Sequence, residues 1–240
     1  MRRIPGKRLN VVALTSCHDR RWDYYKKQAA SNLSYEEDSK RRIFSFVVNK
    51  TRVYFLDGQE IKGKEGDINI ICPGKVLEYE PRTRSVEDLA REGHELGALV
   101  SLPHLFGRKG MATEEGKKLV RAIMERGLVD YVETWSSLDF KKHNQAAENW
   151  FKDMKKGLKL DMSTRKGRNQ EVQRIAVSDG HLDKDVGASY SGVYVEDYKE
   201  ISTFFDKLRE SCVISIEQRN AGRVSRARYF ASLARAATFG

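Results

Sequence analysis

The chain has 240 residues and a formal net charge of +10, from 44 Lys and Arg against 34 Asp and Glu. Its 40% of hydrophobic residues exclude an intrinsically disordered protein. The length suffices for one sizeable core, so we expect a single domain over residues 1–240. The positive balance favours a polyanionic partner such as nucleic acid, although a basic surface without any partner has the same composition.

The cysteines and the apolar stretches indicate where the protein resides. Cys17, Cys72 and Cys212 are an odd number without C-x-x-C spacing, which indicates a reduced protein without a disulfide framework or a zinc ribbon. No apolar stretch approaches the roughly 20 residues of a transmembrane helix, and no apolar signal region follows the basic start. We therefore expect a cytoplasmic protein without a membrane partner.

The first third of the chain predicts a buried strand, a helix and a hairpin. A continuous apolar run over residues 9–16 is typical of a strand buried on both faces. Residues 23–35 have a helical pattern. Two alternating segments around a Lys-Glu-Gly turn predict a hairpin that places Glu60 near Asn69.

Capping residues and apolar runs predict the remaining elements. Ser85 and Asp88 form a capping box that begins a helix, and Gly127 is the stop signal of a later one. Strands that alternate with helices predict an α/β fold with a largely parallel sheet. The predicted helices cover residues 85–97, 113–126, 139–160, 197–211 and 223–237, and the predicted strands cover residues 98–102, 128–132, 174–177, 190–195 and 212–216.

Metal-capable side chains follow several of these strands. In Val177-Ser178-Asp179-Gly180-His181 the acid and the imidazole are two residues apart, so on an extended segment they share a face. The carboxyl ends of barrel strands are where such folds build their sites. A mixed set of histidine and carboxylate ligands suits Zn²⁺, Mn²⁺ or Fe²⁺. The candidates at strand ends are His18, Glu60, His104, Glu133, Asp179 and His181.

The order of these motifs resembles the PHP (polymerase and histidinol phosphatase) superfamily of metal-dependent phosphoesterases. The resemblance runs from about residue 9 to about residue 209, and Asn144 matches the helix before the last motif. It implies a distorted β/α (TIM-like, PHP-type) barrel with up to three metal ions. The metal ligands and catalytic residues that it implies are His18, Glu60, His104, Asp179 and His181.

The chain also departs from the family pattern. The family begins with a strand ending in His-x-His, and this sequence starts after the place of that strand, so we expect a barrel that is incomplete at its N-terminal strand. Asn69 stands where many members have a histidine, and Cys17 where they have an aspartate. A partner chain or second copy, the strand at Cys212, or decay of the site into a binding surface would each account for the missing strand.

Four further residues are candidates for places beside the metal ligands and are called reserve residues below: Cys17, Asn69, Glu133 and His143. A Cys17 thiolate could bind zinc, but a lone cysteine behind a buried strand is more often a core residue. Glu133 is either a group that orients a metal ligand or a plain acid at a strand end. His94 is expected to be an ordinary surface residue.

Basic residues late in the chain are candidates for contacts with a phosphate backbone, or else belong to solvated helix faces. These candidates are Lys155, Lys156, Lys159, Arg165, Lys166 and Arg168. The function that we expect is metal-dependent hydrolysis of phosphate esters, more in nucleic acids or nucleotides than in small metabolites. The alternative is a degenerate PHP-like fold that binds nucleic acid or a protein complex without catalysis.

Overall fold

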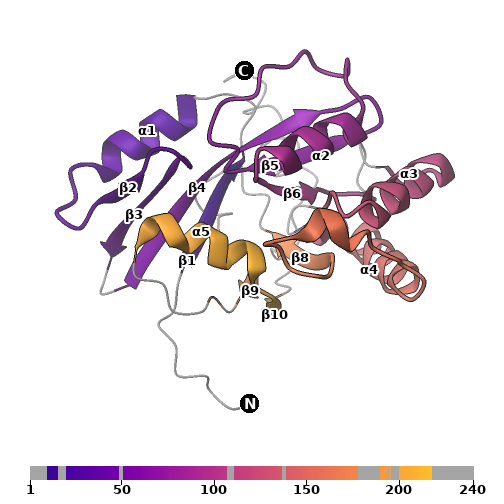
Figure 1. The fold of residues 1–240 in the computed structure, drawn as a ribbon. Helices are drawn as coiled ribbons and strands as arrows, with labels where there is room; N and C mark the ends of the chain where they lie inside the picture. Colours follow the sequence, from indigo (N-terminus) through magenta and orange to yellow (C-terminus); the bar gives the residue numbers. More distant parts are fainter. Residues whose placement is uncertain are drawn as a thin grey trace.

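The computed structural model describes residues 10–15, 20–48, 51–106, 111–136, 139–177, 190–193, 195 and 200–217 (Figure 1). The candidates Cys17, His18, Asp179 and His181 and the predicted helix over residues 223–237 lie outside these ranges. The elements are β1 (Asn10–Thr15), α1 (Arg20–Ala29), β2 (Glu36–Asp38), β3 (Ile43–Val48), β4 (Thr51–Lys62), β5 (Asp67–Ile71), α2 (Val86–Glu95), β6 (Leu99–Leu102), α3 (Glu114–Glu125), β7 (Tyr131–Ser136), α4 (Lys141–Lys155), η1 (Met162–Arg165), β8 (Gln173–Val177), β9 (Tyr190–Val193), α5 (Ile201–Glu210) and β10 (Val213–Glu217).

An eight-stranded sheet forms the centre of the α/β fold. Its order is β2-β3-β4-β5-β6-β7-β8, and β1 pairs in parallel with β4. Gly58 of β4 pairs with both Thr15 of β1 and Ile71 of β5, so β1 and β5 lie on opposite edges of β4. A Cβ at Gly58 would lie 3.2 Å from the Thr15 side chain and 3.3 Å from the Ile71 side chain, so only glycine fits here without displacing a neighbour.

The prediction of a largely parallel sheet is wrong for the strands from β2 to β6. These neighbours pair antiparallel, whereas β1 with β4, β6 with β7 and β7 with β8 are parallel. The connections from Val48 to Thr51 and from Lys62 to Asp67 are too short for a parallel crossover, which needs roughly a dozen residues. Within the described ranges the sheet is open between β2 and β8, and β9 and β10 form a separate antiparallel pair beside β8.

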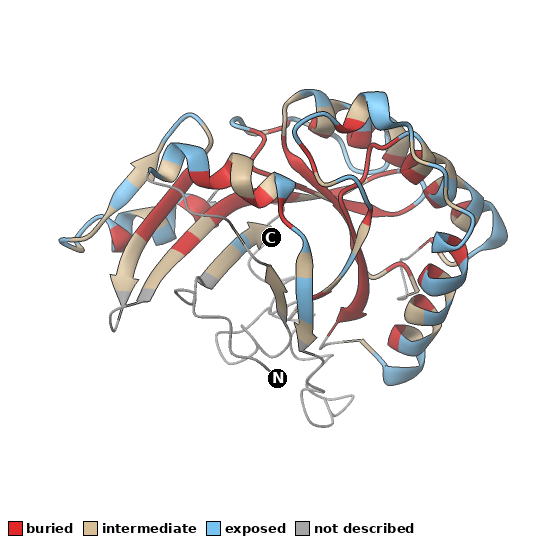
Figure 2. Cartoon of the chain, turned by 60° about the horizontal axis from the view of Figure 1, so that its bottom comes forward, coloured by how far each residue is buried: buried red, intermediate tan, exposed pale blue. Residues whose placement is uncertain are grey.

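Alternating residues of the strands supply two sides of the core. Ile61, Ile70 and Val100 pack with α2, α3 and α4 in one apolar cluster. Tyr54 faces the opposite way and stacks on Phe204 of α5, with ring centroids 4.1 Å apart. Figure 2 shows the buried residues concentrated along the strands and on the helix faces turned toward them. In the described part of the chain, no helix is long and apolar enough to cross a membrane.

Local sequence signals set several boundaries correctly. The Ser85 hydroxyl accepts a hydrogen bond from the Asp88 amide at the start of α2, as the capping box predicts. Gly127 follows α3 with a φ of +71°, a conformation that favours glycine. The strand predicted over residues 128–132 begins later, at Tyr131, because residues 128–130 form an irregular segment between the turn after α3 and β7. Glu133 therefore lies inside β7 and not at its end.

Candidate metal centre

One face of the sheet carries polar side chains on three adjacent strands. Glu60 of β4 lies directly opposite Asn69 of β5, which confirms the predicted hairpin register. Asn69 in turn lies opposite Ser101 of β6. Residues directly opposite each other in an antiparallel pair point to the same face, and so do residues two apart on one strand. Asp67 therefore shares this face with Asn69.

The structure brings Glu60, Asp67 and His104 together. The His104 Nε2 atom lies 3.9 Å from the Glu60 Oε2 atom and 3.9 Å from the Asp67 Oδ2 atom. One ligand atom from each of the three residues lies within 4.8 Å of the others. His104 follows β6 in a backbone conformation with φ of +30°, which is uncommon for a residue with a side chain. These three residues are called the Glu60–Asp67–His104 centre below.

The two separations from His104 suit ligands of one divalent cation. Distances of 3.9 Å are too long for hydrogen bonds. Nitrogen and oxygen ligands lie about 2.0–2.2 Å from a zinc ion, so two ligands of one ion are up to about 4.4 Å apart. The side chain of Asp67 is 3% exposed, that of His104 19% and that of Glu60 27%, so the centre opens to solvent on the side of Glu60. Two carboxylates with one imidazole suit zinc, manganese or iron.

Asp67 was not among the residues singled out from the sequence. It directly follows the turn between β4 and β5, where an aspartate is common for conformational reasons alone. The hairpin register contains a signal, because Asp67 lies two residues from Asn69 and pairs with Lys62, two residues from Glu60. Its proximity to His104 depends on the position of β6 and has no signature in the sequence.

The backbone around Glu60 is fixed by its neighbour Gln59. The Gln59 side chain donates a hydrogen bond to the Leu77 carbonyl oxygen at 3.1 Å and accepts one from the Leu77 amide at 2.6 Å. Since adjacent strand residues point to opposite faces, this interaction holds β4 from the face opposite Glu60. Asn69 stays a reserve residue: its Oδ1 atom is buried and accepts no hydrogen bond from the described residues.

Glu133 and His143 lie beside the centre. Glu133 is 4% exposed and, two residues from Tyr131, occupies the sheet face that carries Ser101. It lines one narrow recess together with His104 and His143. The Nδ1 atom of His143 forms a 2.8 Å hydrogen bond with Asp139 Oδ1. The structure thus places both reserve residues near His104 but outside the three-residue group whose ligand atoms converge.

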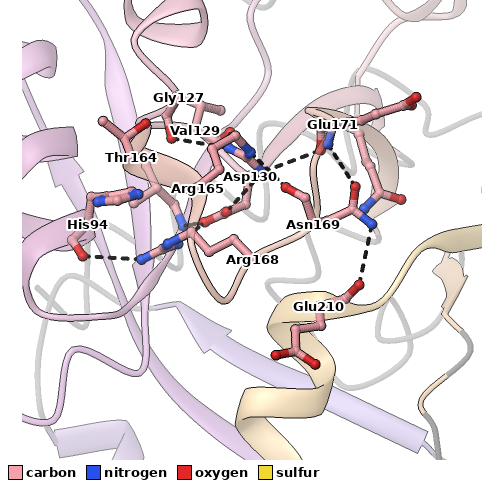
Figure 3. Close-up of polar contacts among 12 residues, drawn as sticks. His94, Gly127, Val129, Asp130, Thr164, Arg165, Arg168, Asn169, Glu171 and Glu210 are labelled. Carbon is pink, nitrogen blue, oxygen red and sulfur yellow. Dashed lines mark hydrogen bonds and ion pairs between the residues drawn. The ribbon is translucent and has the colours of Figure 1, made fainter. Parts of the chain in front are cut away.

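Two predicted nucleic-acid contacts are wrong: the side chains of Arg165 and Arg168 are 0% and 1% exposed. They lie 3.5 Å and 2.6 Å from the carboxylate oxygens of Asp130 (Figure 3). Arg165 also donates to the carbonyl oxygens of Gly127 and Val129. Guanidinium groups that use their donors inside the protein join its segments and offer none to a phosphate backbone.

The four lysines of the predicted nucleic-acid set lie at the surface. Lys155 forms an ion pair with Glu171 at 2.7 Å, and Lys156 forms one with Asp153 at 3.0 Å. Lys159 and Lys166 are exposed. Their role in binding a polyanion stays a prediction.

His94 is not an ordinary surface residue. Its Nε2 atom is buried and has no hydrogen-bond partner among the residues that the structure describes. Its carbonyl oxygen accepts a hydrogen bond from Arg168 at 3.2 Å. Burial of the ring, followed by the positive charge of Arg168, lowers the pKa of His94 to about 4.

No family model and no curated protein matches this chain. Among solved structures, a two-domain protein from Bacteroides vulgatus ATCC 8482 that contains a predicted PHP-like metal-dependent phosphoesterase is similar, with 15% identity, a TM-score of 0.44, and 84% of this chain and 55% of that chain covered. A lesion-specific endonuclease from Pyrococcus furiosus has 15% identity and a TM-score of 0.49 over 86% of this chain and 50% of its own. Endonuclease Q bound to a 27-mer duplex with an abasic lesion has 13% identity and a TM-score of 0.46 over 87% of this chain and 51% of its own.

The chain spans about half the length of these proteins. The activities in their names are those of the three proteins.

Proposed function

We propose that this chain is a hydrolase of phosphate esters that works with a divalent cation at the Glu60–Asp67–His104 centre. The observation that carries the proposal is the convergence of an imidazole nitrogen with two carboxylate groups from three different segments, at 3.9 Å from each. His18, Asp179 and His181 remain proposed further ligands, and the closed PHP-type barrel remains a proposed completion of the open sheet.

The chain's own residues have distinct parts in this reaction. Glu60, Asp67 and His104 would hold the cation, which would supply a Lewis acid for the phosphoryl oxygen and lower the pKa of a coordinated water to about 7. Asp67, almost fully buried, holds its carboxylate in a fixed place, while the more exposed Glu60 lies where an ester can approach. His104, with its uncommon backbone conformation, presents Nε2 between the two acids.

The net charge of +10 supports a polyanionic substrate, so we propose a nucleic acid or nucleotide. The Glu60–Asp67–His104 centre itself carries two carboxylates, and a phosphate group would be repelled there without a cation. We therefore expect the substrate to bind only when the cation is bound. Removing the cation with a chelator should leave little hydrolysis.

The test measures metal affinity and hydrolysis in the same preparations. We expect the wild-type protein to bind Mn²⁺ or Zn²⁺ in isothermal titration calorimetry and to cleave bis(p-nitrophenyl) phosphate only with metal. His104→Ala and Asp67→Asn should each weaken metal binding at least about tenfold, because each removes one ligand. Asp153→Asn is the matched control, since Asp153 is an exposed carboxylate paired with Lys156. A metal affinity that neither centre substitution changes would contradict the proposed site.

A further inference from the structure

A second pair of ionisable side chains lines the same narrow recess as His104 of the candidate centre. Its lining includes His104 and Glu133 together with Asp139, which precedes α4, and His143, in the first turn of α4. Apolar side chains complete the wall: Leu105, Phe106, Trp135 and Ala147. An ionisable pair in such surroundings, next to a site for a reacting group, is a candidate for proton transfer.

The imidazole of His143 is held at one nitrogen. Its Nδ1 atom lies 2.8 Å from the Asp139 Oδ1 atom, and the two side chains are 27% and 16% exposed. A carboxylate on Nδ1 fixes the orientation of the ring. The other nitrogen, Nε2, then becomes the one through which the ring can act on a ligand.

The backbone that carries this pair is also fixed. The Asn144 side chain accepts a hydrogen bond from the Ser136 amide at 3.0 Å and donates one to the Ser136 carbonyl oxygen at 2.8 Å. This clamp joins the end of β7 to the first turn of α4. The ring of Phe140 packs edge-on against His143 with centroids 5.5 Å apart. His143 is therefore positioned by three neighbours beside the strand that carries Glu133.

We propose that His143, held by Asp139, is the proton donor to the leaving group in the reaction of the Glu60–Asp67–His104 centre. This inference rests on the proposed hydrolysis. A water molecule forms the new bond to phosphorus and releases a proton to solvent, while the bond from phosphorus to the leaving oxygen breaks. The electron pair of that bond stays on the leaving oxygen, which takes the proton from His143 Nε2. His143 then regains a proton from solvent.

The competing explanation is a pair that only stabilises α4. Asp139 and His143 are four residues apart, a spacing at which opposite charges on a helix stabilise it by roughly 0.2–0.5 kcal/mol. That role predicts equal activity losses for every substrate. Proton donation predicts a loss that depends on the leaving group, because an alkoxide needs a proton as it departs and p-nitrophenolate does not.

The experiment compares two phosphodiesters with His143→Gln. With a thymidine dinucleotide, whose leaving group is an alkoxide, we expect kcat to fall about 100-fold, within the range typical of general acid catalysis. With bis(p-nitrophenyl) phosphate we expect a change below about threefold on the same reasoning. Asp139→Asn should change both rates in the same directions by smaller factors. Gln145→Ala is the control, since Gln145 is exposed on the same helix and bonds only Asn149 among the described residues.

Equal losses with both diesters would show that His143 merely holds the structure, and unchanged rates with both would show that it takes no part. Either result overturns the inference while leaving the proposed function intact. The proposed function fails separately, if the wild-type protein cleaves neither diester with any divalent cation. If His143→Gln does not fold, the ratio of the rates of Asp139→Asn with the two diesters decides between proton donation and a purely structural role.

Discussion

At the scale of single residues, burial decides which charged groups are available for chemistry. Glu60 and His104 retain partial exposure next to the almost fully buried Asp67, so the Glu60–Asp67–His104 centre can accept a ligand from solvent. Arg165 and Arg168 are enclosed with Asp130 and act within the protein. Removing one member of such a buried group leaves the others without compensation, which makes the group structural.

The buried ring of His94 makes the free energy of unfolding depend on pH. Its pKa of about 4 in the folded protein lies below the ordinary value near 6.5. Between these values the unfolded chain binds more protons, so the stability that neutral His94 contributes is complete above pH 6.5 and is lost as the pH falls toward 4. We expect the free energy of unfolding to decrease over this window and to decrease less in His94→Gln.

Urea denaturation of both proteins across this pH window measures the difference, and NMR titration of the His94 ring protons gives the pKa directly. A His94 ring that titrates near its ordinary value would contradict the buried environment seen in the structure.

At the scale of elements, the junction of β7 and α4 positions His143 beside the strand that carries Glu133. The two hydrogen bonds between Asn144 and the Ser136 backbone are buried. Asn144→Ala removes both of these hydrogen bonds, while the Ser136 carbonyl keeps one from the Asp139 amide at 3.3 Å, and it should lower the free energy of unfolding by about 1–3 kcal/mol. Asn144→Asp keeps the acceptor but loses the donor, so it should also destabilise the protein.

The matched control for this prediction is Asn149→Ala, an exposed position on the same helix whose side chain only accepts a hydrogen bond from Gln145 among the described residues. Its expected effect is within about 0.5 kcal/mol. Equal stability of the Asn144→Ala and Asn149→Ala proteins in denaturant titrations would show that the clamp is unimportant.

At the scale of the whole molecule, the net charge of +10 acts through the residues that remain exposed. Lys159 and Lys166 are exposed, so we expect the double substitution Lys159→Glu and Lys166→Glu to weaken binding of single-stranded DNA. The slope of log K against log salt should decrease by about 0.7 for each phosphate that a lysine no longer neutralises. Fluorescence anisotropy at several salt concentrations measures this slope.

The same charge change at two other exposed lysines, Lys27 in α1 and Lys40 between β2 and β3, serves as the control. If the two double variants weaken binding equally, the net charge alone attracts the polyanion and no lysine of the 155–166 region has a specific role.

The sequence by itself determined the order of most elements, because helix caps, turn glycines and apolar periodicity are properties of short segments. Ser85 and Gly127 indicated helix ends, and the hairpin turn placed Glu60 opposite Asn69. These relations involve residues close in the chain, where local geometry fixes the outcome.

Only the tertiary structure decided which distant residues meet. Asp67 and His104 come together because β5 and β6 pair in one register, and Arg168 is buried because Asp130, 38 residues earlier, lies beside it. Nothing in a short segment distinguishes a lysine or arginine that will face solvent from one that will pair with a buried acid. The physical reason is that burial and ion pairing depend on the packing of segments far apart in the sequence, which local propensities do not encode.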